Sequence, residues 1–593
     1  MYTYKYDKNG EVTEYIKKKA GDTEIYSQSW ESTDGLTSGT KISFDGKSYN
    51  TAVTKDSQTS NILTEKNVLG NKQSFSYDSI GQVLSKKNDI YKLDYSYENI
   101  DTQNAKDNAT GRIQQMIYGK INNSFDTLSL KYEYDISGRI IKVSDTKGSV
   151  LSEYTYDAQG QLLIEKLPKQ NKRYEYIYDT VGNIQAVKTY TLTGTTATDT
   201  TNYTYGDNSW NDLLTAYNGK EITYDGVGNP LTYNNGTAWK FTWEKGRELS
   251  SASSNEKSVT FTYDVDGIRD SKTTNGVKHE YITLDGLIYQ EKWGSNILTF
   301  SYDSNDKPYA VKYNNNIYYY VLNQQGDVIR IVDENGTTKA EYTYDAWGNV
   351  IGSTGTDSGI GAVNSLLYRG YYYDSELGMY YLRSRYYDPG VRRFINADSV
   401  DYLGENKTEL SYNLFAYCEN DAVNLVDSDG TFAIEISMAV GAFLITGLSY
   451  MGYLLMKKLV KSFVSLANSF IRICGIVIKK ALKELEKDIA KSLDKAKKRV
   501  KTKRTERHHI IPRKAKATAV ARAIWTEKVS LSINNSRNLV DINYNLHRVM
   551  HTKVYYDSIE TIIKAAYKKS SVKGVLNAVS VLKGFLKTVS SKL

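Results

Sequence analysis

The stretch YTYDAQGQL, residues 154–162, predicts the fold of most of this chain. Its alternating tyrosines have the period of two of a half-buried β-strand, and Asp157 and Gly160 provide the chemistry of a tight turn into a second strand. The unit recurs, with some first tyrosines replaced by phenylalanine, at Tyr6-Asp7, Tyr77-Asp78, Tyr134-Asp135, Tyr156-Asp157, Tyr178-Asp179, Tyr224-Asp225, Tyr263-Asp264, Tyr302-Asp303 and Tyr344-Asp345. Stacked hairpins of this kind predict an extended sheet or solenoid, because no single unit can bury its own aromatic row.

Composition separates a large acidic body from a smaller basic tail. The chain of 593 residues is long enough for several domains, and it holds 42 glycines and 52 tyrosines but only 5 prolines. Of the tyrosines, 46 precede residue 431. Residues 1–430 carry 44 Lys/Arg and 58 Asp/Glu, whereas residues 431–593 carry 32 and 10. The tail therefore predicts an affinity for polyanions, although basic helices that only keep it soluble would give the same charge.

The sequence indicates neither a disulfide framework nor a secretory leader. Its two cysteines, Cys418 and Cys474, are too few and too far apart for a disulfide scaffold or a thiolate metal site. The start, MYTYKYD, lacks the basic residues and the apolar run of a signal peptide. Export would then use another route or a segment upstream of this sequence.

The repeat signature and its spacing resemble the YD repeats of Rhs proteins over about residues 1–345. This resemblance implies a long β-sheet that winds as a spiral into a hollow shell. A repetitive surface adhesin without a cavity is the alternative.

Residues 341–430 are similar to the repeat-associated core of the Rhs family. The similarity runs through YRGYYYD at 368–374, GMYYLRSRYYDP at 378–389, then Arg393-Phe394 and Asp398. In that family the core closes the shell and precedes an aspartyl self-cleavage site that frees a C-terminal toxin. The resemblance places the essential arginine at Arg385, the two aspartates at Asp398 and Asp427, and the scissile bond after Thr431.

This junction departs from the family pattern. Ser428 and Thr431 stand where the family usually has proline and leucine, and Asp421 stands where an Asn-Pro turn is expected. Two carboxylates suit the chemistry, because one can activate water while the other stays protonated. An ordinary Asp-x-Asp-Gly turn without cleavage is the alternative interpretation of residues 427–430.

Beyond Thr431 the sequence becomes hydrophobic and then basic. Residues 436–456 carry no charge and are long enough to cross a bilayer as a helix, and a second apolar stretch, 463–478, is broken by Arg472. The two interpretations of 436–478 are a hairpin that inserts into a membrane and an apolar helix pair inside the shell. Residues 479–507 carry 13 Lys/Arg and apolar residues at three- and four-residue steps, which predicts a basic amphipathic helix.

The histidines gather near the end of the chain. Of the five, four are His508, His509, His547 and His551. His547 and His551 are four apart on a helix predicted from about residue 544 to 567, which is the spacing that two imidazole ligands of a metal need. His508 and His509 are adjacent on a predicted extended segment, so one can face a metal while the other faces substrate. Asn538 opens a strand predicted at 538–542, where its amide can hold an imidazole in one tautomer.

This constellation resembles the HNH or ββα-metal nucleases, in particular their His-His variants, over about residues 507–556. The resemblance implies one divalent ion held by His508, His547 and His551. It also implies His509 as general base and Asn538 as its orienting partner. Zn²⁺, Ni²⁺ and Mn²⁺ suit three imidazoles better than Mg²⁺ does, and the identity of the ion stays open. A structural zinc module that binds nucleic acid without cutting it is the alternative.

The sequence thus predicts a multidomain α+β protein. Its predicted parts are a YD-repeat β shell at 1–340, the core at 341–430, a hydrophobic hairpin and basic helix at 431–503, and a small ββα-metal nuclease at 504–593. The resemblances imply a secreted or cell-surface toxin that acts in the cytoplasm of a target cell. Its implied partners are a DNA or RNA substrate, a cognate immunity protein, secretion machinery and, through 436–478, the target-cell membrane. The alternative function is that of a surface carbohydrate- or cell-binding repeat protein with a non-catalytic tail that binds nucleic acid.

Overall fold

The computed structural model describes residues 2–6, 12–18, 24–33, 37–79, 81–99, 109–121, 124–399, 404, 408–431, 433–435, 505–509 and 539–543. The chain divides into two compact units, Met1–Leu448 and Ser449–Leu593. The apolar stretches at 436–478, most of the predicted basic helix and the helix predicted at 544–567 lie outside the described residues. Among those that are described, no helix is long and apolar enough to span a membrane.

Each Tyr-Asp unit from Tyr134-Asp135 to Tyr344-Asp345, all of which the structure describes, folds as the predicted strand, turn and strand. In the unit at Asp157, one carboxylate oxygen accepts the backbone N–H groups of Gln159 and Gln161 at 2.9 and 2.8 Å. The N–H of Gly160 closes the turn onto the Asp157 carbonyl at 3.2 Å, and the glycine has a φ of +95°, which a side chain would disfavour. The same pair of contacts from residues two and four positions later recurs at Asp135, Asp145, Asp179, Asp225, Asp264, Asp303, Asp333 and Asp345.

The tyrosine of each unit ties it to the unit before it. The Tyr178 hydroxyl donates to the Leu162 carbonyl at 2.7 Å, and the Tyr344 hydroxyl donates to the Val328 carbonyl at 2.7 Å. These contacts satisfy a phenolic O–H on a half-buried ring, which explains why tyrosine rather than phenylalanine dominates the repeat.

Two antiparallel sheets, of 19 and 14 strands, are built almost entirely from consecutive strands. The first holds β1 (Tyr2–Tyr6), β2 (Val12–Lys18), β3 (Glu24–Thr33), β4 (Thr37–Phe44), β5 (Lys47–Lys55), β6 (Ile62–Lys66), β7 (Lys72–Tyr77), β8 (Val83–Lys87), β9 (Tyr91–Asn99), β10 (Ala109–Lys120), β11 (Leu128–Tyr134), β12 (Ile140–Ser144), β13 (Val150–Tyr156), β14 (Leu162–Leu167), β15 (Lys172–Tyr178), β16 (Ile184–Thr191), β17 (Asp199–Thr204), β18 (Ala216–Tyr217) and β19 (Lys220–Glu221). A short 3₁₀ turn, Pro168–Gln170, joins β14 to β15. The second holds β20 (Thr223–Tyr224), β21 (Pro230–Asn234), β22 (Ala238–Glu244), β23 (Glu248–Ser253), β24 (Ser258–Tyr263), β25 (Arg269–Thr274), β26 (Val277–Leu284), β27 (Leu287–Trp293), β28 (Asn296–Tyr302), β29 (Pro308–Tyr313), β30 (Asn316–Leu322), β31 (Val328–Asp333), β32 (Thr338–Tyr344) and β33 (Val350–Thr354). We call these two sheets the wall.

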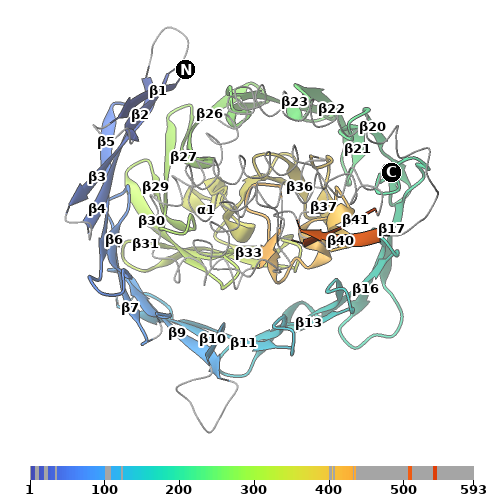
Figure 1. Ribbon diagram of the computed structural model, residues 1–593, viewed down its shortest axis with the longest axis horizontal. Coiled ribbons are helices and arrows are strands. Elements are labelled where there is room, and N and C mark those ends of the chain that lie inside the picture. Colours follow the sequence, from blue (N-terminus) through green and yellow to red (C-terminus); the bar gives the residue numbers. More distant parts are fainter. Residues whose placement is uncertain are drawn as a thin grey trace. The chain divides into compact units, whose positions relative to one another are not determined.

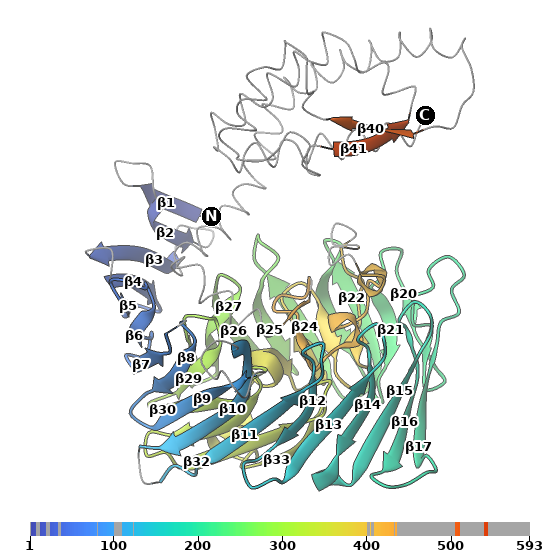
Figure 2. The ribbon, with the colours of Figure 1, turned by 60° about the horizontal axis from the view of Figure 1, so that its bottom comes forward.

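The second sheet winds inward, so that its last strands lie inside the first sheet (Figures 1 and 2). Hydroxyls of the first sheet donate to backbone carbonyls of the second, from Tyr91 to Tyr320 at 3.0 Å and from Tyr118 to Leu322 at 2.8 Å. Buried and exposed residues alternate in β24, whereas β28 and β29 each hold four consecutive buried residues because both of their faces are covered. The predicted β-sheet spiral is confirmed for this unit.

The described residues of 359–435 form a compact segment inside the wall, which we call the plug (Figure 1). It contains α1 (Gly359–Val363), a four-stranded sheet of β34 (Tyr372–Asp374), β35 (Met379–Tyr381), β36 (Tyr386–Asp388) and β37 (Arg393–Phe394), and the pair β38 (Leu425–Val426) and β39 (Ile434–Glu435). Three 3₁₀ turns, Tyr368–Gly370, Leu410–Tyr412 and Cys418–Asn420, connect them.

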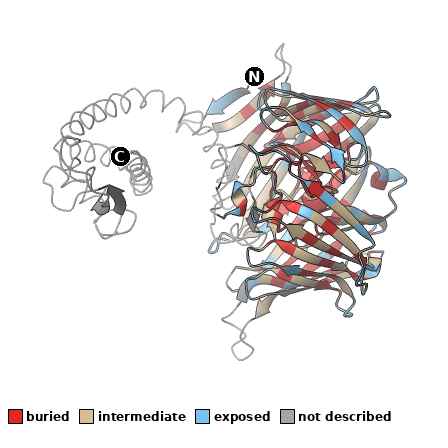
Figure 3. Ribbon diagram, turned by 90° about the vertical axis from the view of Figure 1, so that its right-hand side faces the viewer, coloured by how far each residue is buried: buried red, intermediate tan, exposed pale blue. Residues whose placement is uncertain are grey.

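Polar contacts join the plug to many parts of the wall. They link Tyr156 with Asn424, Asn183 with Asn413, Tyr203 with Val391, Tyr233 with Asp388, Arg269 with Asp374, and Tyr320 with Asn364. Buried residues run through wall and plug alike (Figure 3), and one hydrophobic cluster extends from Ile90 to Val426. Wall and plug therefore share a single core.

In the second unit the structure describes one antiparallel pair, β40 (Thr505–His509) and β41 (Leu539–Asn543). The sequence predicts that the basic helix continues to Arg507. This prediction is wrong for its last residues, because residues 505–507 form a strand that pairs with residues 541–543. Thr505 is β-branched and favours such a strand. The strand predicted at 538–542 is present one residue later.

Candidate functional site

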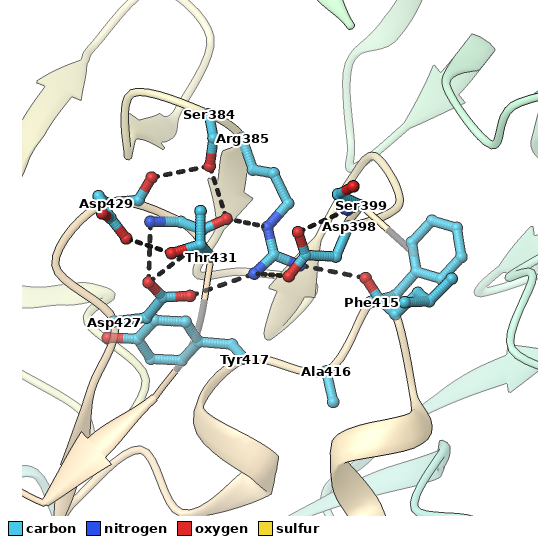
Figure 4. A network of polar contacts seen from close by, with 12 residues as sticks. Ser384, Arg385, Asp398, Ser399, Phe415, Ala416, Tyr417, Asp427, Asp429 and Thr431 are labelled. Atoms are coloured by element: carbon cyan, nitrogen blue, oxygen red, sulfur yellow. Dashed lines mark hydrogen bonds and ion pairs between the residues drawn. The ribbon is translucent and has the colours of Figure 1, made fainter. Parts of the chain in front are cut away.

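The plug brings together the three residues predicted for self-cleavage. Arg385 immediately precedes β36, Asp398 follows β37, and Asp427 follows β38. One terminal nitrogen, Nη2, of the Arg385 guanidinium lies 2.9 Å from Asp398 Oδ2 and 3.1 Å from Asp427 Oδ2 (Figure 4). One guanidinium thus bridges two carboxyl groups that are 29 positions apart in the sequence.

The remaining polar atoms of Arg385 are also occupied. Its Nη1 donates to the Leu414 carbonyl at 3.1 Å, and its Nε donates to the Gly430 carbonyl at 2.5 Å. The guanidinium carbon lies 3.5 Å from the centre of the Phe394 ring, and the side chain is only 4% exposed. These contacts hold a buried cation in one orientation.

Asp427 is the more deeply buried of the two carboxyl groups. Burial raises its pKa to about 7, although Arg385 acts in the opposite direction. Its Oδ1 accepts the backbone N–H groups of Gly430 at 2.8 Å and of Thr431 at 3.0 Å, and its own N–H donates to the Tyr371 hydroxyl at 3.2 Å. Near neutral pH this carboxyl can therefore be present in its protonated form.

Burial also raises the pKa of Asp398. Two neighbours oppose that rise: the Arg385 guanidinium, and the Ser399 N–H, which donates to Asp398 Oδ1 at 2.6 Å. One guanidinium charge neutralises one carboxylate. Burial favours the protonated form of each of the two carboxyl groups, and a single guanidinium charge opposes it. The arrangement can supply one acid and one base.

Ser384 and Asp429 also belong to the site, and neither of them is given a role by the sequence patterns. The Ser384 hydroxyl lies 2.7 Å from the Asp429 carbonyl and 2.6 Å from the Gly430 carbonyl, and the Thr431 hydroxyl donates to Asp429 Oδ1 at 2.6 Å (Figure 4). Ser384 is next to Arg385 in the sequence, but only the fold shows that both reach the segment after β38.

The ordinary-turn interpretation of residues 427–430 describes the local backbone correctly but not its surroundings. Asp427 does accept backbone N–H groups from the following residues, as the turn aspartates of the wall do. Unlike the turn aspartates of the wall, Asp427 also forms an ion pair with Arg385, which in turn forms an ion pair with Asp398.

The predicted nuclease residues are only partly within the described structure. In β40, His508 pairs with Val540 of β41, and His509 pairs with Leu539. This register places His509 opposite the residue that follows Asn538 in the sequence. Asn538, His547 and His551 lie outside the described residues. Within the described part of the chain, no group of three or more His, Cys, Asp or Glu residues is arranged to hold a metal ion.

His279, the fifth histidine, lies in β26 of the wall. Its Nδ1 is 2.7 Å from Glu291 Oε1, and its ring stacks on Trp293 with centroids 5.0 Å apart. Both contacts belong to the wall, so this histidine has a structural role.

Two family models match the chain. The teneurin YD-shell family matches residues 121–423. A nuclease family of the HNH/ENDO VII superfamily with a conserved Ala-His-His motif matches residues 489–590, where this chain has Arg507-His508-His509. These matches confirm the resemblance of the repeats to the Rhs family and that of the C-terminal region to the HNH nucleases.

Three known proteins are similar to parts of this chain. A tRNA3(Ser)-specific nuclease WapA from Bacillus spizizenii is 36% identical over 224 residues, which are 37% of this chain and 9% of that protein. The tRNA nuclease WapA of Bacillus subtilis is 33% identical over 225 residues, again 37% of this chain and 9% of that protein. The double-stranded DNA deaminase toxin A of Burkholderia cenocepacia is 31% identical over 133 residues, 22% of this chain and 8% of that protein. The chain thus spans under a tenth of the length of these relatives.

A solved structure shares the fold. The crystal structure of TcdB2-TccC3-Cdc42 superposes with a TM-score of 0.50 at 17% identity, over 74% of this chain and 27% of that chain. At this identity the likeness concerns the fold alone.

Proposed function

The chain belongs to the teneurin YD-shell family, and from this premise we propose that it is an Rhs-type polymorphic toxin whose C-terminal region is a nuclease. The observation that carries the proposal is the succession of a YD wall and plug by a segment that matches an HNH-superfamily nuclease family at residues 489–590. We propose boundaries after residues 340, 430 and 503 for the shell, the core and the connecting segment.

For the nuclease we propose His509 as the general base that takes a proton from the attacking water, and Asn538 as the residue that orients its imidazole. The strand pairing of β40 with β41 supports the closeness of the two backbone positions, since His509 pairs with Leu539, the neighbour of Asn538 in the sequence. We assign His508, His547 and His551 as metal ligands, because a set of three imidazoles fits a divalent first-row transition ion. When bound, such an ion supplies charge stabilisation at the phosphodiester.

For release of the nuclease we propose self-cleavage near Thr431 by Arg385, Asp398 and Asp427. Burial favours the protonated form of Asp427, which suits a proton donor. Asp398 lies less deeply and suits a proton acceptor. Arg385 holds both carboxyl groups and would keep their total charge near minus one.

The proposed partners follow from this role. They are a DNA or RNA substrate in the cytoplasm of a target cell, a cognate immunity protein that protects the producing cell, and secretion machinery. Residues 436–478 are proposed to meet the target-cell membrane, because residues 436–456 carry no charge and are long enough to cross a bilayer as a helix.

The nuclease proposal is tested with the purified full-length chain. Supercoiled plasmid and tRNA are incubated with it in Zn²⁺, Ni²⁺, Mn²⁺ or Mg²⁺ and in EDTA. We expect cutting of one substrate with at least one ion, loss of cutting in EDTA, and a loss of about 100-fold or more in His509→Ala. His279→Ala, which changes a histidine of the wall, serves as the matched control and should cut as the parent does. Intact substrates under all of these conditions would contradict the proposal, and so would full activity of His509→Ala.

A further inference from the structure

The two sheets of the wall meet at Tyr-Asp turns of the second sheet, where that sheet lies inside the first (Figure 1). Glu65 of β6 accepts the Ser304 N–H with its Oε2 at 3.2 Å. Glu165 of β14 accepts the Ala346 N–H with its Oε1 at 2.7 Å. A glutamate of the first sheet thus makes the same contact with the second sheet at two places, in the turn after β28 and in the turn after β32.

Each contact brings two carboxyl groups together. Glu65 lies beside Asp303 and Glu165 beside Asp345, because each N–H donor belongs to the residue directly after the turn aspartate. All four side chains are buried. Two buried carboxyl groups at close range repel each other when both are ionised, and this repulsion is relieved when one of them takes up a proton.

At Glu65 one lysine serves both carboxyl groups. The charged and titratable side chains that face Glu65 are those of Asp303, Lys86, Tyr77 and Tyr309. Lys86 Nζ lies 3.3 Å from Asp303 Oδ2, and Gln73 Nε2 donates to Glu65 Oε1 at 3.0 Å. Burial raises the pKa of Glu65 to about 7, with Asp303 adding to the rise and Lys86 opposing it.

At Glu165 an arginine of the plug takes the place of the lysine. The charged and titratable side chains that face Glu165 are those of Asp345, Arg392, Tyr154, Tyr174 and Tyr176. The Tyr176 hydroxyl donates to Glu165 Oε2 at 2.9 Å. Burial raises the pKa of Glu165 to about 8, with Asp345 adding to the rise and Arg392 opposing it. Burial raises the pKa of Asp345 as well.

A third turn of the second sheet meets the first sheet through an ion pair instead. Asp264, in the turn after β24, pairs with Lys17 of β2. Lysine and aspartate side chains ordinarily keep their opposite charges from about pH 5 to pH 9. The contact at Asp264 is therefore an internal control for the two contacts that contain a glutamate.

We propose that the pairs Glu65–Asp303 and Glu165–Asp345 form a pH-dependent latch between the two sheets of the wall. The latch holds while one carboxyl group of each pair is protonated, and it loosens when both are ionised. Loosening frees the second sheet to move away from the first without cleavage of the chain. The inference concerns the wall alone and depends on neither the nuclease nor the self-cleavage proposed above.

The direction of the effect follows from the two glutamates. The pKa of each is higher in the closed wall than the ordinary value of 4.5, so the closed form is favoured at low pH. That advantage is lost as the pH rises through about 7 at Glu65 and about 8 at Glu165. Opening becomes easier by up to about tenfold for each pH unit in these windows. A change from mildly acidic to neutral surroundings is thus enough to loosen the latch.

Hydrogen exchange followed by mass spectrometry tests the latch in the full-length chain. Exchange is measured at pH 5.5, 6.5 and 7.5, and the rates are corrected for the intrinsic pH dependence of amide exchange. Peptides that contain the turns 303–307 and 345–349 should lose about tenfold or more of their protection over this range. Peptides that contain the turn 264–268 should keep theirs.

Glutamine variants assign the effect to the two glutamates. Glu65→Gln and Glu165→Gln keep the size of the side chain and an acceptor oxygen but cannot ionise. Each single variant should remove the pH dependence of its own turn, and the double variant should remove both. Glu153→Gln, which changes a half-exposed pair with Lys166, is the matched control and should keep the parental pH dependence.

Three results would overturn the latch. They are protection at 303–307 and 345–349 that does not change with pH, an equal loss of protection at 264–268, and an undiminished pH dependence in the double variant. The first two comparisons are made within the parent chain, so they decide the matter even if the double variant does not fold.

Discussion

Glu165 is a fully buried carboxyl group that joins the two sheets of the wall. It lies in β14, where its Oε1 accepts the Ala346 N–H at 2.7 Å and its Oε2 accepts the Tyr176 hydroxyl at 2.9 Å. Burial raises its pKa to about 8, and the nearby Asp345 adds to the rise. Glu65, Asp421 and Asp427, with pKa values raised to about 7, share this behaviour. The interior thus contains several carboxyl groups that are neutral at mildly acidic pH.

Glu165→Gln should remove part of the pH dependence of stability. The pKa of Glu165 is higher in the folded chain than the ordinary value of 4.5, so its contribution to stability is complete below about pH 4.5 and is lost as the pH rises through about 8. Each pH unit in that window costs at most about 1.4 kcal/mol. Urea unfolding from pH 5 to pH 9 should show a shallower decline for the glutamine variant. Glu153→Gln, in a half-exposed pair with Lys166, is the control and should follow the parent curve; an equal decline in all three proteins would contradict the assignment.

At the scale of the element, the Asp-x-x-Gly turn sets both the end of one strand and the start of the next. The Asp157 carboxylate accepts the backbone N–H groups of Gln159 and Gln161, for which the turn offers no backbone carbonyl. The chain also uses asparagine for this purpose, since Asn323 Oδ1 accepts the Asp327 N–H at 2.9 Å. What the turn requires is a short side chain with an acceptor oxygen, and the charge is secondary.

Asp157→Ala should lower the free energy of unfolding by about 1–3 kcal/mol, because two N–H groups lose their acceptor. Asp157→Asn keeps the acceptor and should cost clearly less. The comparison is made by urea denaturation at neutral pH. If the two variants were equally destabilised, the charge rather than the acceptor would be what the turn needs.

At the scale of the molecule, Arg269 locks the plug to the wall. It projects from β25, lies 2.6 Å from Asp374 of β34, and is wholly buried. Four aromatic rings surround its guanidinium within 5.4 Å, those of Phe261, Tyr281, Tyr372 and Tyr381. Burial among charged and aromatic partners makes this pair costly to break from one side.

Arg269→Met should therefore destabilise the chain by about 3–5 kcal/mol. Since wall and plug share one core, both should lose protection together in hydrogen exchange followed by mass spectrometry. Lys278→Met is the control. It removes an exposed ion pair between Lys278 and Glu280, both in β26, and should have little effect on stability. A plug that exchanges freely inside a protected wall would show that the two unfold separately.

How far the sequence predicts this fold depends on the distance between contacting residues. The hairpin at Asp157 is local, and its turn and strands follow from nine residues. The inward winding that brings Tyr91 to Tyr320, and the pairing of Arg269 with Asp374, join positions more than a hundred residues apart, and no periodicity encodes which positions meet. Arg385, Asp398 and Asp427 could be predicted because a family resemblance supplied them. Ser384 and Asp429 could not, because their roles come from hydrogen bonds that only the folded plug creates.

Because the plug, residues 359–435, follows the wall in the sequence, it is also synthesised after the wall. The ribosome makes the whole wall first, and at about 5–20 residues per second the plug follows over about 4 to 16 s. During that interval the strands of the wall exist without the segment that shares their core, and the nascent chain must be kept from aggregating. The segment that matches the nuclease family emerges later still. Folding of the wall and the plug can thus begin before the segment that matches the nuclease family has been translated.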